Sequence, residues 1–242
     1  MEIAGIQKVS TIDYPGKISC VVFMQGCNFK CGYCHNPELN DFKKGDFSEE
    51  EFFNYIDSRK KLIDGVVICG GEPTLQDSLP YFAREIKKRS LTVKLDTNGS
   101  NYAMLDELNK EGLVDYVAMD VKGPVYLYPK IIGRDFIDLQ DEYEKSIAIV
   151  PTFPDYEFRT TIAPLYENGK IRWITPYEIG DTAKLIYDCT GIRRHKYYLQ
   201  AFVLHKGIVL DSKFKDVGET PKEHLEKCLT EAKKYLINTK IR

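Results

Sequence analysis

Three cysteines lie within eight residues of one another in this 242-residue chain. Cys27, Cys31 and Cys34 stand in the segment QGCNFKCGYCHN, with the spacing C-x3-C-x2-C. Thiolates are the ligands that hold the irons of a [4Fe–4S] cluster. A short loop with three cysteines binds three of the irons and leaves the fourth open to a small molecule. The segment therefore predicts a [4Fe–4S] cluster with one open iron.

A zinc site is the main alternative for these thiols. His35 or a residue elsewhere in the chain would then be the fourth ligand. Zinc loops usually combine one C-x2-C pair with a second pair, and the absence of a second pair disfavours zinc. The other cysteines are not grouped, because Cys20 and Cys69 lie in apolar runs and Cys189 and Cys228 on expected helices. We therefore expect a single cluster.

The composition indicates an ordinary folded protein in a reducing compartment. With 43% hydrophobic residues, the chain can bury one sizeable core. Its formal charge of −2 gives no electrostatic reason to expect nucleic acid as a partner. No run approaches about eighteen apolar residues, and the first residues contain no apolar run of signal-peptide length, so we expect neither a membrane span nor secretion. Seven cysteines, an odd number, then favour the cytoplasm over a disulfide framework.

Apolar runs alternate with helical patterns along the chain. Strands are expected at 18–23, 65–69, 91–97, 114–120, 156–162 and 196–203. Helices are expected at 48–61, 78–89, 101–112, 141–150, 176–191 and 220–237, and residues 124–140 are expected to be irregular. Six strand–helix units predict an α/β fold with a parallel sheet, a partial (βα)6 TIM-like barrel. We expect one domain over 1–242, with its core at about 15–205 and a docked C-terminal helix at about 220–237.

Polar residues and glycines gather at the expected strand ends. They are Gly70, Gly71 and Glu72 in CGGEPTL, Asp96, Thr97 and Asn98 in DTNGS, Asp120 and Lys122 in MDVKGP, and, on the fifth strand, Arg159. Ligands of parallel sheets bind at the carboxyl ends of the strands, so these residues are candidates for binding a ligand. Each also has an ordinary structural interpretation as a glycine turn, a helix cap or an ion pair. The residues alone leave both interpretations open.

The longer string STIDYPGKISCVVFMQGCNFKCGYCHNPEL, residues 10–39, resembles a known family. The cysteine spacing after a first strand, with Tyr33 between the last two cysteines, resembles the radical S-adenosylmethionine (SAM) enzymes. The string is most similar to the activating enzymes of glycyl radical proteins, and most closely to those of anaerobic ribonucleoside-triphosphate reductases. The activating enzymes of pyruvate formate-lyase are similar but further off. The resemblance runs over essentially the whole chain and implies a barrel of the radical SAM type.

This resemblance implies a role for each candidate residue. The three cysteines would bind the cluster, and SAM would bind the open iron. The GGE segment 70–72 would bind the SAM amino group, and residues 96–98 would lie beside SAM. Asp120 and Lys122 match a D-x-K pair that contacts the ribose and the carboxylate of SAM.

The resemblance implies further contacts around the cofactor. Arg159 would pair with the SAM carboxylate, although a structural ion pair is the alternative. Tyr33 would pack beside the cluster and the adenine. The backbone around His35 would contact the adenine, and we assign no acid–base role to the imidazole.

The resemblance also implies the reaction and the partners. Reductive cleavage of SAM gives methionine and a 5′-deoxyadenosyl radical, and the radical removes a hydrogen atom from a glycine of a partner protein. The expected partner is an anaerobic ribonucleotide reductase, and the expected electron donor is flavodoxin or ferredoxin. Two alternatives stay open. One is a radical SAM enzyme that acts on a small molecule or a nucleobase, and the other is a metal-binding module without enzymatic activity.

Overall fold

The structure, a computed structural model, describes residues 1–59, 61–204 and 208–242, which divide into two units. Unit 1 comprises Met1–Asn28, Glu38–Ala118 and Ile149–Tyr156, and unit 2 comprises Phe29–Pro37, Met119–Ala148 and Glu157–Arg242. Residue 60 of the expected helix 48–61 and residue 205, the expected end of the core, lie outside the described residues. The expectation of a single domain stays a prediction.

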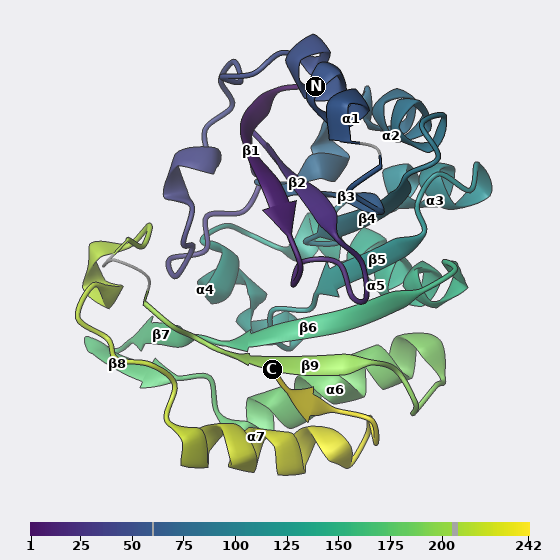
Figure 1. The fold of residues 1–242 in the computed structure, drawn as a ribbon. Helices are drawn as coiled ribbons and strands as arrows, with labels where there is room; N and C mark the ends of the chain where they lie inside the picture. The colour runs from purple at the N-terminus through teal and green to yellow at the C-terminus, as the bar shows by residue number, and fades with distance from the viewer. Residues whose placement is uncertain (60, 205–207) are drawn as a thin grey trace. The chain divides into compact units, whose positions relative to one another are not determined.

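The sheet of unit 1 is parallel except at its first strand (Figure 1). β2 (Ser19–Met24), β3 (Gly65–Gly70) and β4 (Thr92–Thr97) pair in parallel, and β1 (Ile3–Ser10) pairs antiparallel with β2. β5 (Tyr116–Asp120) follows β4 in the strand order, and its residues up to Ala118 belong to unit 1. The central residues of β2 and β3 are almost wholly buried, as expected for parallel strands that are covered on both faces.

Three α-helices follow the strands of unit 1: α1 (Glu49–Arg59), α2 (Leu79–Lys87) and α3 (Tyr102–Lys110). α1 begins with a capping box, because Glu51 N–H donates to Ser48 Oγ at 3.1 Å and Ser48 N–H donates to the Glu51 carboxylate at 2.7 Å. Phe52 of α1 packs against Phe82 of α2, with ring centroids 5.0 Å apart. Each helix thus buries an apolar stripe and returns the chain to the start of the next parallel strand.

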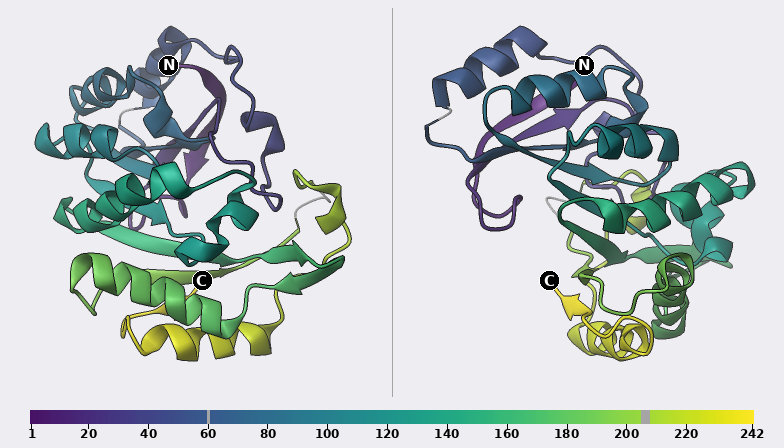
Figure 2. Two further views of the ribbon diagram at one scale, coloured as in Figure 1. Left: turned by 180° about the vertical axis from the view of Figure 1, so that it is seen from behind. Right: turned by 90° about the vertical axis from the view of Figure 1, so that its right-hand side faces the viewer.

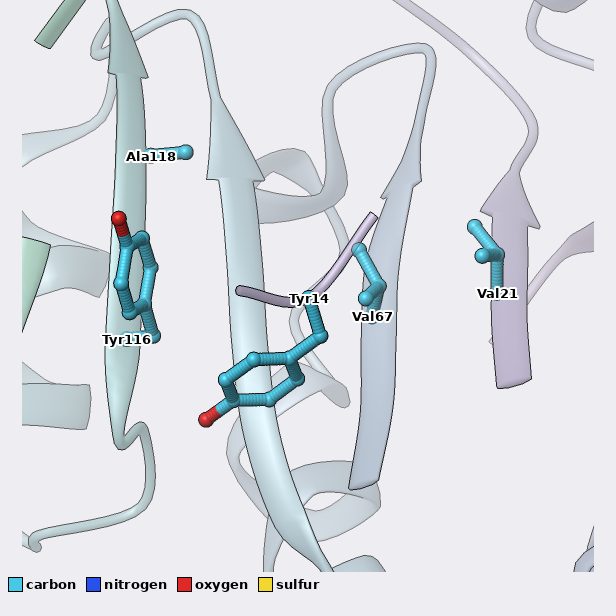
Figure 3. Close-up of a cluster of buried hydrophobic side chains, with 5 residues drawn as sticks. All are labelled: Tyr14, Val21, Val67, Tyr116 and Ala118. Atoms are coloured by element: carbon cyan, nitrogen blue, oxygen red, sulfur yellow. The ribbon is translucent and has the colours of Figure 1, made fainter. Parts of the chain in front are cut away.

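A cluster of buried side chains holds the strands of unit 1 together (Figure 3). Val21 of β2 lies in register with Val67 of β3, and Tyr116 and Ala118 extend from β5. Tyr14, from the connection between β1 and β2, meets Tyr116 edge to face at a centroid distance of 5.9 Å. Burial of these side chains fixes the strands whose ends carry the candidate residues of unit 1.

Unit 2 has parallel strands of its own. β6 (Tyr156–Ile162), whose first residue belongs to unit 1, pairs in parallel with β9 (Tyr197–Ala201), and β9 pairs in parallel with β10 (Lys240–Ile241). β7 (Pro164–Glu167) and β8 (Lys170–Trp173) form a separate antiparallel hairpin. The longer helices are α5 (Gln140–Ile149), α6 (Pro176–Thr190) and α7 (Lys222–Lys233), and Figure 2 shows α7 lying beside α6.

Residues 124–140, expected to be irregular, form three short helices. They are η3 (Val125–Leu127), α4 (Tyr128–Ile132) and η4 (Ile137–Leu139). Pro124, Pro129 and Gly133 divide the segment into pieces too short for a helical period to appear in the sequence. The remaining 3₁₀ helices are η1 (Pro37–Leu39), η2 (Pro73–Leu75), η5 (Val150–Thr152) and η6 (Ser212–Phe214).

The predicted α/β fold with parallel strands is confirmed, and each of the six expected strands is present. The sequence did not predict β1, β10 or the β7–β8 hairpin. Most residues of β1 are at least partly exposed and β10 has two residues, so neither produces a clear apolar pattern. The expected helix 220–237 is shorter at both ends. In the part of the chain that the structure describes, no helix is both long and apolar enough to cross a membrane.

Candidate functional site

The cysteine loop (residues 27–34) begins in unit 1 at Cys27. Gly26 N–H and Cys27 N–H donate to carbonyls of the segment 38–41 at 2.8 and 3.3 Å, and Gln25 Nε2 donates to two more at 2.9 and 2.7 Å. Gly26 has a φ of +94°, and a Cβ there would lie 2.7 Å from the ring of Phe42. The start of the loop is therefore fixed by hydrogen bonds and by a required glycine.

Cys31 and Cys34 lie in the part of the loop that belongs to unit 2. Cys34 N–H donates to Cys31 O at 2.9 Å, which closes a turn. Leu210 N–H donates to Cys34 O at 3.2 Å, and Asp211 N–H donates to Gly32 O at 2.9 Å. The backbone around both thiols is thus held by the segment 210–211.

Gly70 and Gly71 let the end of β3 approach the end of β2 closely. A Cβ on Gly70 would lie 2.2 Å from Met24 N, and a Cβ on Gly71 would lie 2.1 Å from Gly26 O. Gly71 N–H donates to Met24 O and Glu72 N–H donates to Gly26 O, both at 2.8 Å. Any side chain at either glycine would therefore displace the residues that lead into the cysteine loop.

The Glu72 carboxylate is buried and accepts four hydrogen bonds within unit 1. Oε1 accepts from Thr74 N–H (3.1 Å), Thr74 Oγ1 (2.5 Å) and Thr97 Oγ1 (2.8 Å), and Oε2 accepts from Asn98 N–H (2.6 Å). Burial raises the pKa of Glu72, and these donors act in the opposite direction. Glu72 thus joins the end of β3 to the end of β4, and Oε2 retains capacity for one more donor.

Asn28 connects the cysteine loop to the segment DTNGS. Asn98 Nδ2 donates to Asn28 Oδ1 at 3.0 Å, and Asn28 Nδ2 donates to Ser100 Oγ at 2.8 Å. Ser100 N–H donates to Asn98 Oδ1 at 2.9 Å, so the Asn98 side chain also stabilises its own turn. The sequence did not single out Asn28, although its position directly after Cys27 was an available signal.

Asp96 lies on the same face of β4 as a buried lysine, because residues two apart on a strand point to one side. Lys94 is 2% exposed, its ammonium pairs with the Asp96 carboxylate, and it lies 5.8 Å from the ring centroid of Tyr116. Lysines are rarely buried, so no pattern in the sequence pointed to Lys94. The ion pair anchors Asp96 at the end of β4.

Three charged side chains of unit 2 meet where β5 ends, and Arg159 extends there from the middle of β6. Asp120 accepts from Arg159 Nε at 2.9 Å and from Lys122 Nζ at 3.2 Å. Burial alone would raise the pKa of Asp120, but Arg159 and Lys122 outweigh it and hold that pKa below its usual range. Burial raises the pKa of the Cys31 thiol to about 11, and the nearby Lys122 ammonium acts in the opposite direction. Lys122 therefore lies close enough to Cys31 to influence its charge.

Tyr128 holds the backbone at Lys122. Lys122 N–H donates to Tyr128 Oη at 3.0 Å, and Tyr128 Oη is hydrogen-bonded to Tyr143 Oη. Tyr143 Oη also lies 3.4 Å from Asp120 O, to which it donates. Tyr128 belongs to the segment 124–140, for which the sequence offered no interpretation. Its tyrosine hydroxyl, buried beside a D-x-K strand end, is visible only once the fold is known.

Tyr33 and His35 both pack inside unit 2. Tyr33 is 8% exposed, and the imidazole of His35 stacks on the ring of Phe202 with centroids 5.4 Å apart and 17° between the planes. Within either unit, taking the described residues alone, no three His, Cys, Asp or Glu side chains are grouped as ligands of a metal ion. The three cysteines of the loop are divided between the two units.

The sequence candidates thus fall into two groups of interacting side chains. The Glu72 group of unit 1 consists of Glu72, Thr74, Thr97 and Asn98. The Asp120 group of unit 2 consists of Asp120, Lys122 and Arg159. Asp96 pairs with Lys94 outside the first group.

Similarity to known proteins agrees with the cysteine spacing. The family model of the radical SAM superfamily matches residues 21–165. The chain is 36% identical over 244 residues to a provisionally named glycyl-radical enzyme activating enzyme of Methanocaldococcus jannaschii, across 99% of this chain and 95% of that protein. It is 34% identical over 129 residues to the pyruvate formate-lyase-activating enzyme of Clostridium pasteurianum, across 50% of this chain and 52% of that protein.

Solved structures share the fold. SuiB of Streptococcus suis bound to S-adenosylmethionine has a TM-score of 0.63 and 13% identity, over 90% of this chain and 48% of SuiB. Coproporphyrinogen III oxidase of Escherichia coli has a TM-score of 0.59 and 14% identity, over 90% of this chain and 51% of the oxidase. This chain therefore corresponds to about half of each of those proteins, and the likeness concerns the fold. The family match, the full-length relative and the fold together show that the chain belongs to the radical SAM superfamily.

Proposed function

We propose that this chain is an activating enzyme that removes a hydrogen atom from a glycine of a partner protein and leaves a glycyl radical there. One observation carries the proposal. A chain with the C-x3-C-x2-C loop is similar, over 99% of its length, to a protein provisionally named a glycyl-radical enzyme activating enzyme. The full-length similarity matters because a fold alone is shared by enzymes with many different substrates.

The cysteine loop fits a [4Fe–4S] cluster with one open iron. Cys27, Cys31 and Cys34 supply three thiols within eight residues, without a fourth cysteine beside them in the sequence. The loop has room for no side chain at Gly32, where a Cβ would lie 2.7 Å from the ring of Phe214. When bound, the cluster supplies the electron that cleaves SAM and generates the 5′-deoxyadenosyl radical.

The Asp120 group suits the charged end of SAM. Arg159 and Lys122 pair with one carboxylate, and the Lys122 ammonium, with its three N–H donors, can also donate to a second anion such as the SAM carboxylate. Arg159 keeps the pairing with that carboxylate that the resemblance implies. Asp120 has lone pairs left to accept a ribose hydroxyl. The hydrogen bond from Lys122 N–H to Tyr128 fixes the backbone from which the ammonium extends.

The Glu72 group suits the ammonium of SAM. Oε2 of Glu72 accepts one hydrogen bond in the structure and can accept another. Asp96, held by Lys94, adds a carboxylate at the next strand end. The other candidates keep the roles expected from the resemblance: Gly70 and Gly71 through close backbone approach, Thr97 and Asn98 beside SAM, and Tyr33 and the backbone of His35 beside the adenine.

The partner protein, the electron donor and the compartment can also be proposed. We propose an anaerobic ribonucleotide reductase as the protein that carries the glycine, because the string of residues 10–39 resembles that branch of activating enzymes most closely. Flavodoxin or ferredoxin would supply the electron. Cysteine thiols that must stay reduced at a cluster site suit the reducing cytoplasm of an anaerobically growing cell.

The test has two stages. The chain is first reconstituted anaerobically with iron and sulfide, reduced with dithionite, and measured by electron paramagnetic resonance with and without SAM. We expect a [4Fe–4S]⁺ signal that changes when SAM is added. The chain is then mixed with SAM and the anaerobic ribonucleotide reductase of the same organism, and a glycyl radical signal should appear together with 5′-deoxyadenosine.

The controls separate the competing functions. A reductase in which the target glycine is replaced by alanine should give no glycyl radical signal. SAM cleavage that depends on a small metabolite, and not on the reductase, would favour the small-molecule alternative. A protein that binds zinc and leaves SAM intact would contradict the proposal and favour the alternative of a metal-binding module without enzymatic activity.

A further inference from the structure

A groove of about 540 Å³ in unit 2 borders the cysteine loop. Its walls come from four segments of unit 2, namely the cysteine loop, α4 with the glycine that ends it, the strand β7, and residues 210–214. Lys30, Gly32 and Tyr33 are the loop residues in the lining. A molecule in this groove would therefore touch residues that lie between the cluster-binding cysteines in the sequence.

The groove is joined to the cysteine loop by backbone hydrogen bonds. Lys30 N–H donates to Ile132 O at 2.8 Å, and the segment 210–211 donates to Gly32 O at 2.9 Å and to Cys34 O at 3.2 Å. A Cβ on Gly133 would lie 2.7 Å from Lys30 O, so α4 and the loop are in close contact. The surface of the groove and the cysteine loop thus form one connected structure.

The lining of the groove is positively charged although the chain as a whole is acidic. Three lysines, Lys30, Lys130 and Lys213, face one carboxylate, Asp211, which gives the lining a formal charge of +2. The whole chain carries −2. Lys213 pairs loosely with Asp211 at 3.4 Å, and Lys130 pairs with Glu167, which stands outside the lining. Lys30 is exposed, and the described residues provide it with no ion pair.

The groove also offers apolar and aromatic surface among these lysines. Tyr166 is 46% exposed, and the ammonium of Lys213 lies 4.7 Å from its ring centroid. Leu210 is 37% exposed. Lysines around a partly apolar centre are typical of surfaces that bind another protein briefly, because the charges guide the approach and the apolar atoms hold the contact.

We propose that this groove is the docking site of the electron donor, and that the donor is an acidic electron-transfer protein. The proposal rests on the proposed function, since only an enzyme with a reducible cluster needs such a donor. An acidic donor is repelled by a chain of net negative charge unless a local positive surface guides it. The groove provides that surface directly beside the loop that carries Cys31 and Cys34. Electron-transfer contacts are small, which suits a groove of this size.

The test compares a protein donor with a small reductant on the full, reconstituted chain. Lys30→Glu, Lys213→Glu and the double variant are mixed anaerobically with reduced flavodoxin and, separately, with photoreduced deazaflavin. Cluster reduction is followed by absorbance in a stopped-flow instrument at low and high salt. The matched control is Lys222→Glu, which makes the same change of charge at an exposed position of unit 2 outside the groove.

We expect each single variant to slow reduction by flavodoxin by roughly threefold to tenfold at low salt, and the double variant to slow it more. The difference should shrink at high salt, because screening weakens steering between exposed charges. Reduction by deazaflavin and the behaviour of Lys222→Glu should match the parent. Lys30→Gln and Lys213→Gln, with half the change of charge, should give smaller effects.

Three results would overturn the docking site. The first is unchanged reduction by flavodoxin in the double variant. The second is equal slowing with deazaflavin, which would mean that the lysines act on the cluster itself. The third is normal reduction with a loss of glycyl radical on the partner, which would assign the groove to the glycine-bearing protein. Failure of the proposed function is a distinct result, since the unmutated chain would then form no glycyl radical on the partner with either reductant.

Discussion

The Glu72 group and the Asp120 group both lie near strand ends, but the carboxylate of the first is hydrogen-bonded to neutral donors and that of the second is paired with cations. The Glu72 carboxylate is 1% exposed and takes all four of its hydrogen bonds from uncharged donors. Asp120 has a side chain that is 34% exposed, and it pairs with two cations. A buried carboxylate surrounded by neutral donors fixes the backbone around it, whereas partly exposed charged side chains can also reach a ligand. Both groups are proposed contacts of SAM, but we expect substitutions in the Glu72 group to change mainly stability and substitutions in the Asp120 group to change mainly ligand binding.

The largest effect is expected at Cys31, because neither group has a function in SAM cleavage unless the loop binds its cluster. Cys31→Ala should remove the cluster and SAM cleavage while the chain still folds, since a thiol ligand is lost and only a small buried side chain is truncated. Iron and sulfide analysis, the electron paramagnetic resonance spectrum and circular dichroism measure these effects. Cys228→Ala, at another buried cysteine of unit 2, should keep the cluster. An unchanged iron content in Cys31→Ala would refute the ligand assignment.

The next effect is a loss of stability at Glu72. Glu72→Gln replaces one carboxylate oxygen by an N–H₂ group. That group cannot accept the hydrogen bonds that Thr74 and Thr97 donate to one oxygen, or the hydrogen bond that Asn98 donates to the other. We expect the free energy of unfolding to fall by about 3 kcal/mol, the cost of leaving buried donors unpaired. Urea unfolding measures it, and Glu111→Gln, at an exposed ion pair of unit 1, should change it by less than about 0.5 kcal/mol. A stable Glu72→Gln variant with weak SAM binding would reverse the distinction between the groups.

Lys122→Met should weaken SAM binding more than it lowers the free energy of unfolding. Asp120 keeps Arg159 as a partner when the ammonium is removed, so we expect unfolding to change by less than about 1 kcal/mol. SAM should bind at least about tenfold more weakly, because a charge-assisted hydrogen bond is lost. Isothermal titration with SAM, on reconstituted protein, measures the affinity. Lys110→Met, at a surface ion pair of α3, is the control that should leave both quantities unchanged.

Tyr128→Phe tests whether the Asp120 group depends on its backbone support. The variant removes the acceptor of Lys122 N–H and the partner of Tyr143, so we expect a loss of stability of about 1 kcal/mol and a few-fold weaker SAM binding. Tyr126→Phe, two residues away, removes an exposed hydroxyl that is bonded to Asp181. It should be nearly neutral in both measurements. Equal effects of the two substitutions would show that Tyr128 has no special role in placing Lys122.

The sequence predicted the parallel strands and the candidate segments because these depend on local patterns. Apolar runs of four to six residues mark β2 and β3, and the cysteine spacing marks the loop. Asn28, Lys94 and Tyr128 were missed, because Asn28 depends on a distant partner, and the burial of Lys94 and the hydrogen bond from Lys122 N–H to Tyr128 exist only in the folded chain. Asn28 meets a residue 70 positions away, and a sequence pattern holds no information about such a pair. For the same reason, the sequence pointed to Glu72 as a contact of the ligand but did not reveal its hydrogen bonds to Thr97 and Asn98.

The smallest expected effect is a difference of sign in the pH dependence of the two carboxyl groups. Burial raises the pKa of Glu72 above its ordinary value of about 4.5. The protonated carboxyl group therefore contributes stability that is fully present below about pH 4.5 and is lost as the pH rises through the folded pKa. Although burial acts the other way at Asp120, Arg159 and Lys122 hold its pKa below 3.8. The stability that the Asp120 carboxylate contributes is therefore present above about pH 3.8 and is lost as the pH falls through the folded pKa.

Urea unfolding of the parent, Glu72→Gln and Asp120→Asn between about pH 3 and pH 7 measures both trends, because each difference from the parent isolates one carboxyl group. The stability difference between the parent and Glu72→Gln should shrink as the pH rises above about 4.5. The difference between the parent and Asp120→Asn should shrink as the pH falls below about 3.8. If both differences shrank as the pH fell, the neutral donors would outweigh burial at Glu72 and hold its pKa below the ordinary value, as the two cations do at Asp120. The expected contrast between a group that mainly stabilises the fold and a group proposed mainly to bind a ligand would then lose its electrostatic basis.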